Sequence, residues 1–355
     1  MVKSTIEETR VSNEQAIKTY RPDARISDID ALIVKDFSVY YETEAGTVKA
    51  CDNVSLTLKQ GERFALVGES GSGKTTLAMG LMRLTRPPGH IAKGSVKLNG
   101  RDVTKLSDDE MRKTRLSELA LVPQGAMNSL NPVMRIEQQI MDGIIDHLDE
   151  GDSRPSAQEL DEIVKDLLNR VGLRPQVARL YPHELSGGMK QRVAMAIGIS
   201  LKPNLIIADE PTSALDVVVQ RQIMQTLGRL QEGLDASIML VGHDMGLVAQ
   251  FADTIGVMYA GRMVEVGPVY EVFSNPKHTY TQLLIQSLPS LKEKKELVGI
   301  PGLPPKLIDL PPGCVFSPRC PKPTEECKKG KIEMGLIEVS PGHLVDKCCV
   351  NCGQN

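Results

Sequence analysis

The sequence predicts an α/β fold in which a mostly parallel sheet is flanked by helices. Two uninterrupted apolar runs, residues 205–208 and 237–242, are typical of strands that are covered on both faces. A helix-like segment, residues 217–231, separates them, and this β–α–β order is that of a parallel sheet. A third apolar run, residues 64–67, leads into a glycine-rich segment and then a helical pattern.

Length and composition limit the function classes before any motif is considered. A chain of 355 residues exceeds one ordinary domain and predicts two or three modules, at ~150 residues each. Hydrophobic residues at 41% and charged residues at 25% are ordinary for a packed protein. A net charge of -3 and only 3% aromatic residues argue against a chain built to coat nucleic acid or to stack bases.

No stretch of the sequence has the length and apolar character of a membrane span. The longest uncharged stretch, residues 119–134, covers 16 residues and includes two prolines and several amides. A span needs about 20 predominantly apolar residues. The polar first 15 residues lack the apolar core of a secretory signal. We therefore expect a soluble, cytoplasmic protein.

The elements follow in order along the chain. Residues 1–29 are polar and form an expected extension, and short apolar runs at 31–34 and 54–58 predict strands. Another strand is expected at 95–98. Ser107 with Glu110 forms a capping box that should open a helix.

The middle and the end of the chain have different characters. Residues from about 135 to 180 read as helical, and the apolar positions within 157–171 share one helix face. Near residue 289 a charge run and then five prolines between 301 and 312 indicate a linker into a small, loop-rich tail. The expected organisation is an extension at 1–29, a main domain at 30–280 with a helical subdomain at about 126–185, and a C-terminal extension at 281–355.

Residues 68–75 read Gly-Glu-Ser-Gly-Ser-Gly-Lys-Thr and match the Walker A pattern G-x-x-x-x-G-K-[ST] in full. The expected strand before it and helix after it provide the context this pattern requires. Glycines let successive backbone N–H groups face a phosphate, and the helix start adds its positive dipole end. Lys74 is expected to reach the β- and γ-phosphates, and the Thr75 hydroxyl to bind Mg²⁺. The candidate ATP-binding residues of this loop are Gly68, Glu69, Ser70, Gly71, Ser72, Gly73, Lys74, Thr75 and Thr76.

Two acids end the apolar strand at 205–208. Adjacent strand residues point in opposite directions, so Asp209 and Glu210 should have different roles. Asp209 is the candidate Mg²⁺ ligand, and Glu210 is the candidate group that polarises an attacking water.

Residues 185–192 read Leu-Ser-Gly-Gly-Met-Lys-Gln-Arg and closely resemble the signature motif of ATP-binding-cassette (ABC) ATPases. The resemblance implies a P-loop NTPase (RecA-like) nucleotide-binding domain with a helical subdomain. It also implies that this loop binds the γ-phosphate held by an opposite subunit, and that the loop ending at Asp216 crosses the dimer interface. The residues expected to contact ATP in trans are Ser186, Gly187, Gly188, Gln191 and Asp216.

Further positions take roles from the same resemblance. Tyr41 matches the aromatic residue that stacks on adenine, with Tyr40 as the alternative. Gln124 matches the glutamine that touches Mg²⁺ and senses the membrane partner, and His243 matches the histidine that holds the γ-phosphate and the attacking water. The expected catalytic set is thus Glu210, His243 and Gln124, with Thr75, Gln124 and Asp209 at Mg²⁺.

Segments at 129–132, 181–188, 275–284 and 313–320 resemble the oligopeptide/dipeptide importer branch, and the resemblance spans roughly residues 31–352. Gly125 departs from that branch, which often has an acid there. The resemblance implies an ATPase subunit that drives uptake of peptides on the cytoplasmic face of a membrane. Its implied partners are a second ATPase subunit, identical or paralogous, two permease subunits and an extracytoplasmic binding protein. An oligosaccharide or nickel importer and a soluble non-transport ABC ATPase are the alternatives.

Six of the seven cysteines fall in the last 42 residues. In this branch the tail carries four cysteines, with which some members hold a [4Fe-4S] cluster. Cys314, Cys320 and Cys327 match the first three, and the fourth is Cys348, Cys349 or Cys352, with Cys348 preferred. Four thiolates also suit Zn²⁺, and free thiols or a disulfide are further alternatives. Cys51 is expected in the core.

Overall fold

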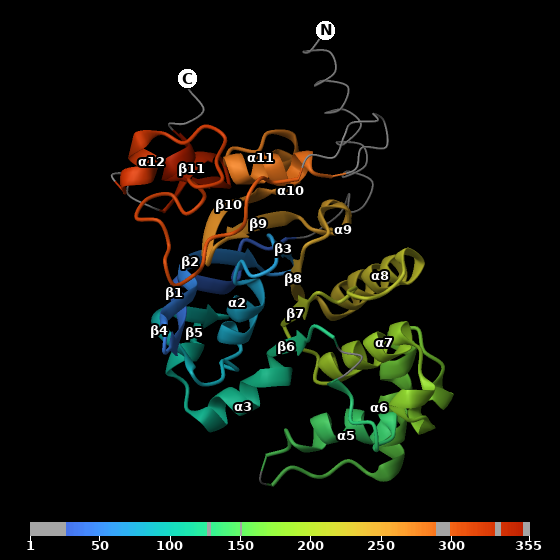
Figure 1. The fold of residues 1–355 in the computed structure, drawn as a ribbon. Helices are drawn as coiled ribbons and strands as arrows, with labels where there is room; N and C mark the ends of the chain where they lie inside the picture. Colours follow the sequence, from blue (N-terminus) through green and yellow to red (C-terminus); the bar gives the residue numbers. More distant parts are fainter. Residues whose placement is uncertain (1–25, 126–128, 150, 289–298, 331–334, 351–355) are drawn as a thin grey trace.

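The computed structural model describes residues 26–125, 129–149, 151–288, 299–330 and 335–350. Within these residues the strands form two sheets (Figure 1). The smaller sheet is antiparallel, in the order β2-β1-β4-β5. Its strands are β1 (Asp30–Thr43), β2 (Gly46–Lys59), β4 (Gly89–Leu98) and β5 (Arg101–Asp102).

The larger sheet has the order β11-β12-β10-β9-β3-β8-β7-β6. Its strands are β3 (Arg63–Val67), β6 (Leu119–Val122), β7 (Leu205–Asp209), β8 (Ser237–Gly242), β9 (Thr254–Tyr259), β10 (Arg262–Pro268), β11 (Leu336–Ser340) and β12 (His343–Asp346). Strands β3, β6, β7, β8 and β9 run parallel, and the expected central strands at 205–208 and 237–242 are confirmed as β7 and β8. Every residue of β3 and β7 is buried, as the apolar runs predict.

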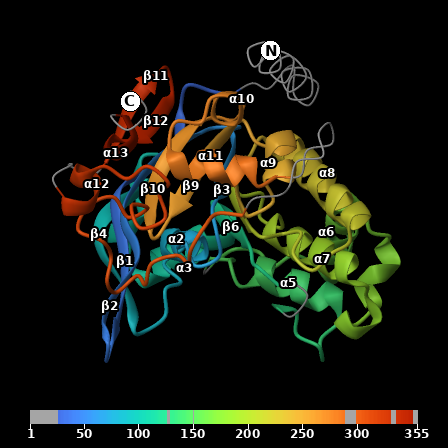
Figure 2. The same cartoon turned by 45° about the horizontal axis from the view of Figure 1, so that its top comes forward.

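The helices that connect these strands lie on both faces of the larger sheet (Figures 1 and 2). The helices of the described residues are α2 (Lys74–Leu81), α3 (Asp108–Ser117), α5 (Ile136–Ile145), α6 (Ala157–Arg170), α7 (Gly187–Gly198), α8 (Val217–Leu234), α9 (Met245–Phe251), α10 (Val269–Ser274), α11 (Thr279–Gln286), α12 (Glu325–Lys329) and α13 (Lys347–Val350), with 3₁₀ turns at Val103–Lys105, Pro175–Arg179 and Pro182–Glu184.

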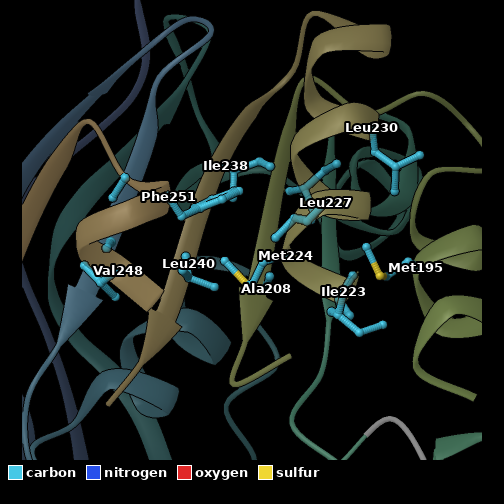
Figure 3. Packing of buried hydrophobic residues seen from close by; sticks show 14 of the residues in the cluster. Met195, Ala208, Ile223, Met224, Leu227, Leu230, Ile238, Leu240, Val248 and Phe251 are labelled. Atoms are coloured by element: carbon cyan, nitrogen blue, oxygen red, sulfur yellow. The ribbon is translucent and has the colours of Figure 1, made fainter. Parts of the chain in front are cut away.

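Two apolar clusters divide the core. One lies between the two sheets, where Leu77 and Leu81 of α2 pack with Leu32 of β1 and Leu205 of β7. The other fills the space between the larger sheet and α7, α8 and α9, and Figure 3 shows its packing. Met195, Leu227 and Ile238, which are buried, lie among the side chains of that cluster.

The helical part formed by α5, α6 and α7 lies beside the edge strand β6 (Figure 1). Helix α6 begins at a capping box of Ser156 and Glu159, and its buried residues face one way, which confirms the single apolar face expected for 157–171. Helix α3 begins at the expected capping box, with Ser107 and Glu110 bonding reciprocally.

The C-terminal tail joins the larger sheet, which the sequence did not predict. Strand β12 pairs antiparallel with β10, and β11 pairs with β12. The tail is rich in loops, as expected, but its two strands extend the sheet at the edge beyond β10. No helix of the described residues is long and apolar enough to cross a bilayer.

Candidate functional site

The phosphate loop lies between the carboxyl end of β3 and the start of α2. Gly68 and Gly73 have positive φ, 150° and 101°. A Cβ atom on either would stand 2.1 Å from a backbone oxygen, that of Met258 or of Ala50. Only glycine fits at these two positions, so the loop backbone can pass close to its neighbours.

Lys74 closes the loop on itself. Its Nζ donates to the carbonyl oxygens of Gly68 and Glu69, both at 2.8 Å, and lies 3.3 Å from the Ser72 hydroxyl. Burial lowers the pKa of Lys74, against the opposing effect of the nearby Glu210 and Asp209. A cation held only by carbonyls and a hydroxyl is ready to exchange these contacts for an anionic ligand.

Asp209 and Glu210 have different partners, as expected, although β7 ends at Asp209 and Glu210 lies beyond the strand with a left-handed backbone. Asp209 is buried, and its carboxylate accepts a hydrogen bond from the Thr75 hydroxyl at 3.3 Å. Burial raises the Asp209 pKa. The hydroxyl and the carboxylate together form the oxygen pair that a Mg²⁺ ion prefers.

Glu210 lies at the centre of a second group. Its Oε2 accepts from Gln124 Nε2 at 2.9 Å, and its Oε1 is 3.3 Å from His243 Nδ1. The three side chains come from the carboxyl ends of β6, β7 and β8, which are neighbours in the sheet. Parallel strands bring their carboxyl ends to one edge, so residues 119 positions apart meet there.

A small pocket of ≈ 150 Å³ borders this group. Glu210 and His243 line it together with Ser213, Gln220 and Leu247. None of the phosphate-loop residues lines it. It therefore adjoins the side of Glu210 that faces the loop between β7 and α8.

The two tyrosines of β1 point to opposite faces of the strand. Tyr41 is half-buried and packs against Gly89, where any Cβ would meet its ring. The Tyr40 hydroxyl instead donates to Asp52 at 2.7 Å. The Tyr40 side chain is thus engaged inside the protein, whereas the Tyr41 hydroxyl makes no hydrogen bond to the described residues.

The residues expected to act in trans lie at two helix starts. Ser186 is the N-cap of α7 and Asp216 is the N-cap of α8, and both are exposed. Gly188 contacts Val219 so closely that a Cβ would stand 2.6 Å from that side chain. Gln191 differs from the expectation: it is only 4% exposed and points into the chain. One helical turn after the exposed Ser186, the same helix presents its inner face.

Gly125, the departure from the importer branch, has a φ of 64°. This left-handed conformation favours glycine over an acid. The substitution therefore agrees with the local backbone directly after Gln124.

Three of the tail cysteines, Cys314, Cys348 and Cys349, lie around His278. The Sγ atom of Cys348 is 3.3 Å from that of Cys314 and 3.9 Å from that of Cys349, and it is 3.8 Å from His278 Nε2. Cys320 lies near enough to Cys349 and Cys314 for their charges to raise its pKa, after burial as the larger cause. The Cys327 thiol accepts from the Thr324 hydroxyl, and its carbonyl accepts from the Cys314 amide.

The thiols of this group influence one another's protonation. The hydrogen bond with Cys348 lowers the pKa of Cys314 and of Cys349, and the same contacts raise the pKa of Cys348. Each described cysteine is free of disulfide bonds, and Cys352 lies outside the described residues. Cys51 is fully buried, which confirms its place in the core.

His278 was not singled out from the sequence. Its Nδ1 accepts the backbone N–H of Tyr280 at 3.1 Å and caps α11, so its hydrogen sits on Nε2 and faces sulfur. Burial lowers the pKa of His278, but hydrogen bonds and charge from Cys314 and Cys349 outweigh burial and raise it; protonation would keep the Nε2 hydrogen but would place a second one on Nδ1 and remove the acceptor of the Tyr280 N–H. His278 is therefore a donor to the cysteines rather than a metal ligand. The buried pair of Glu265 and His343 holds it, since Glu265 accepts the His278 amide.

Comparison with known proteins gives two family matches. Residues 51–213 match the family described as ABC transporter, and residues 264–327 match the C-terminal region of oligopeptide/dipeptide transporters. The second match includes His278, Cys314 and Cys320, which the structure brings together in space.

Individual proteins give the same picture. The chain is 41% identical to the dipeptide transport ATP-binding protein DppD of Escherichia coli K12, over 86% of this chain and 93% of that protein. It is 41% identical to the oligopeptide transport ATP-binding protein OppD of Salmonella typhimurium LT2, over 88% and 92%. Among solved structures, a dimeric ATP-binding cassette bound to ADP and Pi has a TM-score of 0.60 and 28% identity, covering 67% of this chain and 98% of that one.

Proposed function

The chain belongs to the oligopeptide/dipeptide branch of the ABC transporter ATPases, and on that premise we propose that it powers import of di- and oligopeptides through a separate membrane permease. It is an ATPase, as its family is. The observation that carries the catalytic assignment is the meeting of Gln124, Glu210 and His243 at the carboxyl edge of the sheet, beside the phosphate loop.

In the proposed reaction the phosphates of ATP lie over residues 68–76. Lys74 leaves the carbonyls of Gly68 and Glu69 for the β- and γ-phosphates, where it stabilises the transferring charge. Thr75, Asp209 and Gln124 would hold Mg²⁺ through oxygen atoms, and the ion would supply positive charge to offset that of the phosphates.

Glu210 orients the attacking water and accepts its proton. Its carboxylate already bonds Gln124 and lies against His243, and these two contacts fix its direction. His243 is exposed in this chain, with 67% of its side chain accessible, so it is free to contact the γ-phosphate. Tyr41 supplies the aromatic face for adenine.

The second half of the site comes from a second ATPase subunit. Ser186, Gly187 and Gly188 present the start of α7, and Asp216 presents the start of α8. Val217 and Val218, next to Asp216, are 79% and 66% exposed. Apolar side chains at such exposure, next to the exposed N-cap residue Asp216, favour a partner surface there. Gln191 is buried within its own chain, so we do not propose that it contacts ATP of the second subunit.

Two permease subunits and an extracytoplasmic binding protein complete the proposed transporter, with this chain on the cytoplasmic face of the membrane. The helical part beside Gln124 is the proposed permease contact. Val133, at its start, is 79% exposed, which supports a partner at that end of the molecule.

We propose that Cys314, Cys320, Cys327 and Cys348 hold a [4Fe-4S] cluster, with Zn²⁺ as the alternative. Largely buried cysteines from three segments, none of them in a disulfide, fit a thiolate-bound centre, and His278 Nε2 provides a hydrogen bond to sulfur. Cys349 competes with Cys348 as the fourth ligand because both thiols lie within 4.8 Å of His278. A cluster would supply a one-electron redox centre bound to the tail.

The peptide cargo is tested by uptake in cells. Replacing the chromosomal gene with the Glu210→Gln variant should abolish uptake of a labelled tripeptide and leave uptake of the free amino acid unchanged. Normal tripeptide uptake together with lost uptake of an oligosaccharide or of nickel would reject peptides as the cargo.

The cluster is tested by metal analysis of protein purified without air. Four irons and four sulfides per chain, with absorbance near about 400 nm, are expected. One zinc per chain and no colour would select the alternative.

A further inference from the structure

Glu69, the second residue of the phosphate loop, is held by two side chains from the C-terminal part of the chain. Its carboxylate accepts hydrogen bonds from Arg319 Nη1 at 2.6 Å and Nη2 at 3.1 Å. Its backbone N–H donates to the Tyr280 hydroxyl oxygen at 2.9 Å. Neither residue belongs to β3 or α2, the elements that flank the loop. The loop is therefore fixed from outside its own strand–helix unit.

The guanidinium of Arg319 has a single orientation. It is buried, with 4% of its side chain exposed, and its Nε donates to the Pro301 carbonyl at 2.8 Å. Nη1 also reaches the Tyr259 hydroxyl and Nη2 the Ile300 carbonyl, each at 3.3 Å. A planar fork with its donors occupied in this way fixes the position of the carboxylate it binds.

The Tyr280 hydroxyl is positioned by packing. Its ring is fully buried, and its centroid lies 4.6 Å from that of Tyr259 and 5.4 Å from that of Phe316. Phe316 belongs to the same short tail segment as Arg319. Strand β9, helix α11 and the tail thus meet in one aromatic cluster directly behind Glu69.

The Tyr280 hydroxyl holds the Gly68–Glu69 peptide group through the Glu69 N–H, and the carbonyl oxygen of the same peptide group accepts from Lys74. The carbonyl oxygens of Gly68 and Glu69 accept from its Nζ, both at 2.8 Å. When Lys74 leaves for a phosphate, these two carbonyls lose their donor. Arg319 and Tyr280 keep the loop backbone in place during that exchange, so that binding does not have to order the loop.

We infer that Arg319 and Tyr280 are positioning residues of the ATP site, by which the C-terminal tail preorganises the phosphate loop. The inference rests on the assignment of residues 68–75 to the phosphates of ATP. The two residues act on the phosphate loop and not on the water-activating group of Gln124, Glu210 and His243. We therefore expect their substitution to weaken ATP binding without changing the rate at which bound ATP is hydrolysed.

The test measures ATP affinity and the KM and kcat of basal hydrolysis on the full chain. Arg319→Gln should raise the Kd and KM for ATP about tenfold with kcat within about twofold. Tyr280→Phe keeps the ring in its cluster and removes only the acceptor of the Glu69 N–H, so it should raise KM about threefold.

The matched control is Glu232→Gln. Glu232 accepts from the buried Arg63 at 2.9 Å, so this change also removes a carboxylate from a buried arginine. Arg63 begins β3, whereas the phosphate loop follows its other end. Glu232→Gln should therefore lower the thermal midpoint without changing KM.

A double-mutant cycle separates positioning from general destabilisation. Glu69→Gln alone should weaken ATP binding as Arg319→Gln does, and the double variant should be no weaker than either one. Unchanged KM in folded Arg319→Gln and Tyr280→Phe, a loss of kcat instead, or fully additive effects would each overturn the inference. A wild-type chain that fails to bind ATP would reject the underlying site assignment instead.

Discussion

Glu210 has a left-handed backbone conformation, with a φ of 44°, at the position where β7 has ended. Non-glycine residues in this region carry a strain of about 1–3 kcal/mol and cluster at functional sites. The conformation turns the side chain away from Asp209 and toward Gln124 and His243. This backbone conformation explains why Asp209 contacts Thr75 whereas the adjacent Glu210 contacts Gln124 and His243.

Glu210→Gln tests this residue directly. The amide keeps the size of the side chain but cannot accept the proton of the attacking water, so ATP hydrolysis should fall by at least about 100-fold. ATP should still bind within a few-fold of the wild-type affinity. Phosphate release and nucleotide binding by the purified chain measure the two quantities. Hydrolysis within twofold of the wild type would remove Glu210 from the role of base.

Asp52 provides a prediction about pH. Burial would raise the pKa of Asp52, but hydrogen bonds from Tyr40 and Arg262 lower it below its usual value of 3.8. A carboxyl with a lowered folded pKa contributes stability above its unfolded pKa and loses it only as the pH falls through the folded pKa.

Asp52→Asn should therefore destabilise the protein by about 1–2 kcal/mol, equally at pH 8, 6 and 5. The difference should shrink only below about pH 4. Urea unfolding of both proteins across this range is the measurement. A difference that already narrows between pH 7 and pH 5 would mean that the Asp52 pKa is raised.

At the scale of elements, sequence patterns formed by neighbouring residues correctly predicted a helix cap and the central strands. Ser107 and Glu110 are three residues apart and cap α3 as the pattern predicts, and the apolar runs at 205–208 and 237–242 are parallel strands. Strands β11 and β12 were missed because they have only five and four residues and neither alternation nor a continuous apolar run marks them, although β12 is mostly buried. Their pairing with β10 is set by tertiary contacts.

Ser107→Ala measures the cap. The hydroxyl accepts the Glu110 N–H, and without it that donor loses its partner at the helix start. Unfolding free energy should fall by about 1 kcal/mol with ATP affinity unchanged. Glu110→Gln is the matched variant, since glutamine also completes a capping box, and it should lose less. A loss in Glu110→Gln as large as that in Ser107→Ala would mean that the Glu110 carboxylate contributes as much to the cap as the Ser107 hydroxyl, contrary to this expectation.

At the scale of the whole molecule, two valines that lie far apart in the sequence have equally exposed side chains. Val217, beside Asp216, and Val133, at the start of the helical part, are both 79% exposed. The first lies on the surface proposed to meet a second ATPase subunit, and the second on that proposed to meet the permease.

In the Glu210→Gln background ATP should produce a dimer on gel filtration. Adding Val217→Asp should leave a monomer because a charge would be buried in the interface. Val133→Asp, the matched control, should still dimerise and should lose stimulation by the permease. A dimer that survives Val217→Asp would displace the proposed interface from the start of α8.

Some residues of the site can be predicted from the sequence, and others cannot. Residues 68–75 and Glu210 belong to patterns with a direct chemical meaning. Arg319 is 250 residues from its partner Glu69, and nothing in its neighbourhood distinguishes it from the other arginines. The inward direction of Gln191 likewise depends on how α7 is rotated in the core, which spacing alone does not determine.

The separation of Glu69 and Arg319 also has a consequence for biosynthesis. A ribosome adds about 5–20 residues per second, so the loop precedes its tail contact by roughly 10–50 s. Within that interval β3 can pair with β8 and β9 once residues 237–259 have been added, but the loop still lacks its outer support. A growing cassette should therefore hold ATP weakly until residue 319 has been added and folded. Such a delay would keep a newly made ATPase subunit from hydrolysing ATP while its partners assemble.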